Sequence, residues 1–182
     1  MNIFNRDALK KPSCWSLVLL VMLPFSLVAH AQVDTLKYDP VIQAAQQFGS
    51  LCDVAENTLW ACKTSKKTYS LCASKDLSAS KGYLQYRAGT RESVEFRYPS
   101  RLGHPKDFFK AQSFGHGFGI TFRSQSYEYS ISEDMWWGDL ASIEIASVKK
   151  PEKIISHFYC PSTGTLDATS MMDYFKEIGI RN

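Results

Sequence analysis

The sequence predicts an all-β or β-dominated fold, an antiparallel barrel or sandwich of about eight strands with a short helix near each end. Aromatic residues make up 13% of the 182 residues, and aromatic and β-branched side chains favour the half-buried surface of a sheet. Short runs with alternating apolar positions recur from residue 57 onward, which is typical of strands. Cysteines in the body of the chain fit a disulfide-bonded domain of this kind. They are Cys52, Cys62, Cys72 and Cys160.

The N-terminus has the three parts of a secretory signal. A basic stretch precedes an almost entirely apolar run over residues 13–28, and Ala29-His30-Ala31 supplies the small-x-small cleavage pattern. The alternative is a membrane anchor, but a span takes about 20 apolar residues, and this run is shorter and contains Pro24. We therefore expect a signal peptide over residues 1–31 and a single secreted β-rich domain over residues 32–182, in the periplasm or outside the cell.

Cleavage at this position leaves 18 basic and 17 acidic residues, because residues 1–31 hold three of the 21 basic and one of the 18 acidic residues. Nucleic-acid-binding domains are strongly basic, so we expect no nucleic-acid partner, and no membrane span remains in the cleaved form. The charge is nevertheless uneven, since residues 61–110 carry eleven Lys or Arg against four Asp or Glu. One shared basic face would attract an anionic polymer or an acidic protein. Its candidates are Lys63, Lys66, Lys67, Arg87, Arg91 and Arg97.

Four cysteines follow the expected cleavage site, and an even number in an exported chain predicts two disulfides. Of the three possible pairings, one joins Cys62 to Cys72 across a hairpin and Cys52 to Cys160. Its rival joins Cys62 to Cys160 and Cys52 to Cys72, and the sequence does not choose between them. A zinc site is disfavoured because the spacing lacks a C-x-x-C pair and an oxidising compartment disfavours thiolates.

Helices are expected at both ends of the domain, with strands between them. Asp39-Pro40 supplies an N-cap and a first-turn proline for a helix that ends before Gly49. Residues 100–116 are expected to be irregular. A second helix is expected over Met171–Ile178, with Ser170 as its N-cap. The expected strands lie over residues 57–63, 67–73, 83–87, 94–98, 118–123, 126–132, 140–146 and 153–159.

No motif in the sequence indicates catalysis or a bound cofactor. The glycine-rich run 115–119 precedes a strand rather than a helix, so it lacks the context of a phosphate-binding loop. The three histidines of the domain have no metal-ligand spacing, and we expect no metal and no cofactor. A binding protein is therefore favoured over an enzyme. Paired carboxylates keep a glycoside hydrolase open as an alternative. The candidates are Glu128, Glu133 and Asp134.

Two adjacent tryptophans lie in a segment that is expected to be a loop, residues 133–139. Asp134 and Asp139 frame Trp136 and Trp137 in this segment. Tryptophans anchor many protein interfaces, and their rings stack on sugars. Because consecutive side chains diverge, we expect one tryptophan to fill the core and the other to form a binding surface with the two aspartates.

A set of cysteines and short runs resembles a group of uncharacterised secreted bacterial proteins. Those proteins carry a cysteine and a basic turn before S-L-C-A-S, then G-Y-L-Q-Y-R, then a late strand that ends in cysteine. The match covers residues 50–160, at Cys62, Ser70–Ser74, Gly82–Arg87 and Cys160, and implies no activity. The layout is also similar to periplasmic lysozyme inhibitors, which are small β-barrels with a signal peptide, although their Ser-Gly-x-Tyr inhibitory loop is absent from this sequence.

These observations predict a soluble binding protein of the cell envelope that contacts an envelope protein or a glycan. The more specific prediction is that the protein inhibits or neutralises a cell-wall-active hydrolase and contacts it through the tryptophan loop. Two alternatives stay open. One is a carboxylate-dependent envelope hydrolase, and the other is a passive structural or anionic-polymer-binding module that uses the basic face.

Overall fold

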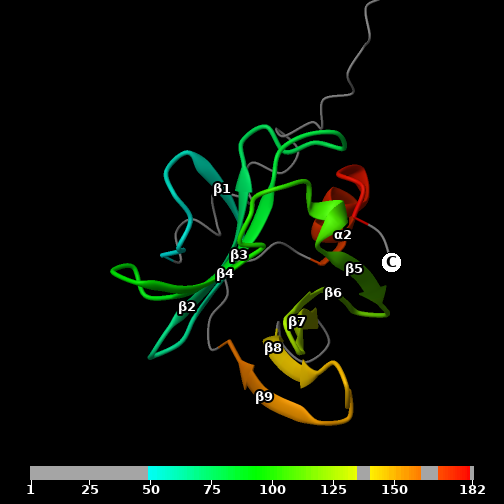
Figure 1. Cartoon of the computed structure of the whole chain (residues 1–182). Helices are drawn as coiled ribbons and strands as arrows, with labels where there is room; N and C mark the ends of the chain where they lie inside the picture. Colours follow the sequence, from blue (N-terminus) through cyan, green and yellow to red (C-terminus); the bar gives the residue numbers. More distant parts are fainter. Residues whose placement is uncertain (1–48, 135–139, 161–167, 181–182) are drawn as a thin grey trace, which may run out of the picture. The chain divides into compact units, whose positions relative to one another are not determined.

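A computed structural model describes residues 49–134, 140–160 and 168–180, and it contains nine strands in two antiparallel sheets (Figure 1). The first sheet has the order β1-β2-β3-β4 and the second the order β5-β6-β7-β8-β9, so within each sheet every strand pairs with its neighbours in the chain. The strands of the first sheet are β1 (Glu56–Lys63), β2 (Thr68–Ser74), β3 (Leu84–Gly89) and β4 (Val94–Tyr98). Those of the second are β5 (Lys110–Phe114), β6 (Gly117–Ser124), β7 (Tyr127–Asp134), β8 (Leu140–Ser147) and β9 (Ile154–Tyr159).

The predicted β-dominated class is confirmed, and all eight expected strands are present with ends shifted by at most two residues. The barrel alternative is wrong for the described residues, in which the two sheets stay separate. The ninth strand, β5, lies in the segment that was expected to be irregular. Its sequence KAQSF buries only Ala111, so it carries little apolar alternation. The same segment also holds a short 3-10 helix, η2 (Pro105–Asp107).

The core lies between the two sheets, which pack through rows of apolar side chains. Leu71 and Tyr86 from the first sheet belong to one buried cluster with Ile120, Ile131 and Ile143 from the second. A stack of four aromatic rings from both sheets adds to it. The stack runs Tyr98–Phe122–Tyr129–Phe96, with centroid separations of 4.4, 4.8 and 5.2 Å. Such ring pairs contribute about 0.5–1.5 kcal/mol each beyond their buried area.

The C-terminal helix α2 (Ala168–Glu177) packs on the second sheet beside β5 and β6 (Figure 1). The Phe175 ring meets Phe118 of β6 edge-on, at a centroid separation of 6.2 Å. The helix begins earlier than expected, so Ser170 lies within it and is not its N-cap. The helix expected before Gly49 lies outside the described residues. No helix among the described residues is long and apolar enough to cross a bilayer.

Two disulfides join Cys52 to Cys72 and Cys62 to Cys160, so the second of the two pairings weighed above is the correct one. The strand register explains the choice. Cys62 belongs to the core cluster, whereas Cys72 lies between the core residues Leu71 and Ala73 and therefore points to the opposite face of the sheet. The Cys62–Cys160 bond ties the first sheet to the end of β9. The Cys52–Cys72 bond ties the segment before β1 to the outer face of β2.

Candidate functional site

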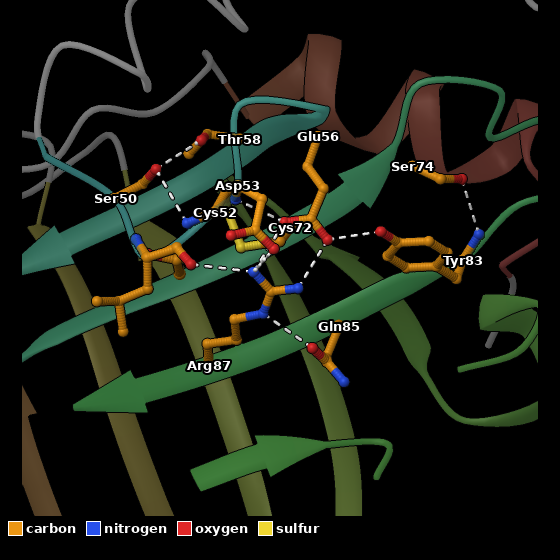
Figure 2. A network of polar contacts seen from close by, with 12 residues as sticks. Ser50, Cys52, Asp53, Glu56, Thr58, Cys72, Ser74, Tyr83, Gln85 and Arg87 are labelled. Atoms are coloured by element: carbon orange, nitrogen blue, oxygen red, sulfur yellow. Dashed lines mark hydrogen bonds and ion pairs between the residues drawn. A yellow bond between two sulfur atoms is a disulfide. The ribbon is translucent and has the colours of Figure 1, made fainter. Parts of the chain in front are cut away.

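The outer face of the first sheet, which points away from the core, carries a buried ion pair (Figure 2). The Arg87 guanidinium donates to both oxygens of Glu56 at 2.7 Å, and the two side chains are 8% and 4% exposed. Arg87 also donates to the Leu51 carbonyl at 3.0 Å and to Gln85 Oε1 at 2.8 Å. Asp53 lies at the solvent side of this pair, 3.4 Å from Arg87 Nη1.

The Glu56 carboxylate is fully occupied by these neighbours. Besides the two bonds from Arg87, it accepts the Tyr83 hydroxyl at 2.6 Å and the Asp53 backbone N–H at 2.7 Å. Burial, together with the hydrogen bond to Glu56, raises the pKa of Tyr83 to about 12. No lone pair of Glu56 is left to accept a proton from a substrate, so the arrangement supports structure rather than acid–base chemistry.

The ion pair and the Cys52–Cys72 disulfide together fasten the segment before β1 to the sheet. Leu51 N–H donates to Ser70 Oγ of β2 at 3.0 Å, next to these two attachments. Cys52, Glu56 and Cys72 lie close enough to suggest a metal site. The two sulfurs are bonded to each other, however, and the Glu56 oxygens accept four hydrogen bonds, so this cluster offers no free ligand atom.

A different site lies at the end of the first sheet, where two turns meet beside a cleft of about 350 Å³. One turn, Thr64–Lys67, joins β1 to β2, and the other, Thr90–Ser93, joins β3 to β4. Strand β2 pairs with both β1 and β3, and Thr68 lies opposite both Lys63 and Gly89. This register sets the two turns side by side. Residues of both turns line this cleft, and we call it the basic cleft.

Local hydrogen bonds fix the shape of both turns. Thr64 Oγ1 donates to the Lys67 carbonyl and accepts the backbone N–H of Lys67, and Thr90 and Ser93 exchange two backbone hydrogen bonds. Gly89 leads into the second turn with a φ of +146°, and a Cβ there would lie 2.3 Å from the Ser93 carbonyl oxygen. The second turn therefore requires glycine at this position.

Basic side chains dominate the cleft wall. They are Lys63, Lys66, Lys67 and Arg91. Lys67 is bonded to Glu95 at 2.5 Å, and this hydrogen bond and charge raise the pKa of Lys67. Among the described residues of the wall, Glu92 is the only carboxylate, and its pKa is lowered chiefly by its own backbone N–H and then by the Thr90 side chain. The hydrogen-bond partners of Glu92 thus belong to its own turn, and the four basic side chains give the cleft a net positive charge.

The structure brings together four of the six basic residues that were candidates for one face. Arg87 is the clear exception, because it is buried in the ion pair with Glu56. Arg97 is exposed on β4 and donates to the Val94 carbonyl, outside the cleft wall. The pairing of Arg87 with Glu56 was not expected from the sequence, where the two residues lie 31 positions apart.

The predicted contact surface lies largely beyond the described residues. Trp136, Trp137 and Asp139 fall in the undescribed segment 135–139, and only Asp134 is described. The loop expected over residues 133–139 is wrong at its start, because Glu133 and Asp134 belong to β7. Glu133 pairs there with Phe118 and Ala141 and is buried, so it continues the strand.

The structure does not bring the candidate hydrolase carboxylates together. Glu128 and Glu133 lie five residues apart on β7, and strand alternation sends them to opposite faces of the sheet. Glu128 accepts a hydrogen bond from Arg123 at 2.6 Å, whereas Glu133 is 4% exposed. A glycosidase needs two carboxyl groups that flank the same bond, and this pair does not meet that requirement.

No family model, curated protein or solved structure matches the chain. The resemblance to secreted bacterial proteins therefore stays a prediction, and the functional argument rests on the geometry of the sites.

Proposed function

We propose that the chain is an exported binding protein of the cell envelope that holds an anionic ligand in its basic cleft. The main supporting observation is the convergence of Lys63, Lys66, Lys67 and Arg91 on a single concave site. Its volume of about 350 Å³ falls within the range of about 300–1,000 Å³ that is usual for ligand pockets. A phosphate, sulfate or carboxylate group of a polymer would meet several cations there at once.

The carboxylates of the protein itself leave most of the positive charge of the cleft free to attract an anionic ligand. Glu95 neutralises part of the charge of Lys67, but both side chains are about half exposed, so water and salt screen this pair. Glu92 is held by its own turn. Lys63, Lys66 and Arg91 lie on the exposed wall, and a concave surface lined by one sign of charge concentrates counter-ions.

The cleft wall is better suited to binding than to catalysis. Among the described residues that line it there is no His, Cys or Asp that could serve as base or nucleophile. The Thr64 hydroxyl is already engaged in holding its turn, since it donates to the Lys67 carbonyl. A ligand in the cleft would therefore be held by charge and hydrogen bonds without being turned over.

The two disulfides support a location outside the cytoplasm. Such bonds persist in oxidising compartments and are rare where glutathione keeps thiols reduced. They link the segment before β1, β1, β2 and the end of β9 into one covalent frame. In the envelope, this frame would present the two turns to acidic polymers or acidic surfaces.

A matched pair of variants tests the proposal. Lys66→Gln/Arg91→Gln removes two charges from the cleft wall, and Lys75→Gln/Arg101→Gln removes two exposed charges elsewhere in the same basic region. Isothermal titration with inorganic polyphosphate is expected to show about tenfold weaker binding for the cleft variant, equivalent to 1.4 kcal/mol. The control is expected to bind like the wild type. Equal weakening by both pairs would show diffuse attraction instead of a site and would overturn the proposal.

The inhibitor version of the function stays a prediction, with Trp136 and Trp137 as its contact residues. Salt separates the two versions, because cleft binding should weaken steeply as salt rises and a tryptophan-anchored contact should not. A pull-down from envelope extract with wild type and Trp136→Ala/Trp137→Ala tests the tryptophan contact directly. The inhibitor version fails if the same proteins are retained by both forms.

A further inference from the structure

A second pocket, of about 240 Å³, is lined by residues from η2, from β4 of the first sheet and from β5, β6 and β7 of the second sheet, and it differs in character from the basic cleft. Its floor is aromatic and is formed by Tyr98, Phe108 and Phe122. Its rim carries two acidic and two basic side chains. They are Asp107, Lys110, Arg123 and Glu128.

The aromatic floor is held in place by the core beneath it. Tyr98 stacks on Phe122 at 4.4 Å, and Phe122 continues the stack of rings that crosses between the sheets. Phe108 meets the Tyr98 ring edge-on, and the Tyr98 hydroxyl donates to the Phe108 carbonyl at 3.4 Å. Tyr98 and Phe108 are both half-buried, and both line the pocket.

Strand register places the charged residues around this floor. Lys110 of β5 lies opposite Thr121 of β6, and Arg123 of β6 lies opposite Glu128 of β7. Arg123 donates to Glu128 at 2.6 Å, and Asp107 comes from η2. The rim therefore offers hydrogen-bond donors and acceptors, and its two positive and two negative formal charges cancel.

This combination excludes several kinds of ligand. An anion would meet the carboxylates of Asp107 and Glu128, and a cation would meet Lys110 and Arg123. A hydrocarbon would bury charged groups without giving them hydrogen bonds, which is costly. A sugar ring avoids each of these penalties, since its C–H face packs on an aromatic ring and its hydroxyls both donate and accept.

We propose that this pocket binds a neutral saccharide. The volume lies below the range of about 300–1,000 Å³ that is usual for drug-sized ligands, which favours a single ring or the end of a chain. The site is independent of the basic cleft, because the two share no lining residue. Each proposal can therefore fail without the other.

The test is a titration of the ¹⁵N-labelled protein with methyl glycosides of glucose and N-acetylglucosamine at millimolar concentration. Binding is expected to shift the backbone amides of residues 107–110 and 121–128. Phe108→Ala removes part of the floor and Asp107→Asn removes one rim charge, and each is expected to raise the Kd about tenfold. Tyr127→Ala is the control, since it removes an exposed aromatic ring outside the pocket wall and is expected to bind like the wild type.

Asp107→Asn changes an exposed side chain, so it keeps the test valid if Phe108→Ala fails to fold. A Kd that is unchanged by added salt supports the proposal, because a neutral sugar displaces no counter-ions. The proposal is overturned if neither glycoside moves these amides. It is also overturned if Tyr127→Ala weakens binding as much as Asp107→Asn, or if sodium phosphate competes with the sugar for the pocket.

Discussion

Replacing Glu56 with alanine should strongly destabilise the fold, because it leaves the Arg87 guanidinium buried without its main counter-charge. Breaking a buried ion pair by removing one partner costs about 3–5 kcal/mol. The structure favours the lower part of that range. Arg87, which is 8% exposed, would keep its bonds to the Leu51 carbonyl and to Gln85, and Asp53 would remain 3.4 Å away.

A loss of about 3–4 kcal/mol is a large share of the stability of a domain, which is about 5–15 kcal/mol. It corresponds to a fall in Tm of about 6–16 °C at about 2–4 °C per kcal/mol for a chain of this size. Urea unfolding of the oxidised protein at neutral pH measures it, with tryptophan fluorescence, to which the fully buried Trp60 contributes, as one probe and circular dichroism as the other. Coincident transitions from the two probes would justify the two-state treatment.

Two further variants separate the ion pair from general effects of substitution. Asp76→Ala breaks an exposed pair with Lys81, whose atoms lie 3.8 Å apart, and should cost less than about 1 kcal/mol. Glu56→Leu/Arg87→Met removes both buried charges and should recover part of the loss, since the cost lies in the orphaned charge. If Glu56→Ala loses no more than Asp76→Ala, the ion pair does not fasten the segment before β1, and the structural argument is refuted.

Three other predictions concern covalent linkage, pH and backbone geometry. Cys62→Ser/Cys160→Ser opens a loop with a sequence separation of 98 and should lower the free energy of unfolding by about 4.7 kcal/mol, as measured in urea; a loss below about 1 kcal/mol would contradict this. Because the pKa of Tyr83 is raised from 10.0 to about 12, its contribution to stability is complete below pH 10 and is lost as the pH rises towards 12. Tyr83→Phe should therefore lose less stability across that window in a series of urea titrations, and an identical decline would count against the assignment. Gly89→Ala should lower the free energy of unfolding by more than about 1 kcal/mol and also weaken polyphosphate binding, since the Cβ of the alanine would collide with the Ser93 carbonyl. Wild-type stability in urea together with wild-type binding of polyphosphate would contradict this prediction.

Much of the fold follows from local pattern. Strand β2 alternates Tyr69, Leu71 and Ala73 towards the core with Ser70 and Cys72 between them, and such alternation predicts a strand without knowledge of its partners. Strand β5 lacks this signal, because Gln112 and Ser113 are exposed and Ala111 alone is buried. Whether the sheets close into a barrel depends on pairing between distant strands, which local alternation does not encode.

The disulfide pairing and the buried ion pair depend on register, and the sequence leaves register open. Cys72 points away from the core only because its neighbours in β2 point towards it. Arg87 was counted as a surface charge because arginine is most often exposed, and nothing near it in the chain marks Glu56 as its partner. The basic cleft was partly predictable, since Lys66 and Lys67 come from one basic turn. Its second wall, with Arg91, required the pairing of β2 with β3.

The most direct test of the central claim is to map where inorganic polyphosphate binds on the ¹⁵N-labelled oxidised protein. The basic cleft predicts that amide shifts concentrate in the two turns, at residues 63–68 and 89–92, and that they saturate together with one affinity. Shifts scattered over the exposed lysines and arginines of the chain, or none in either turn, would contradict it.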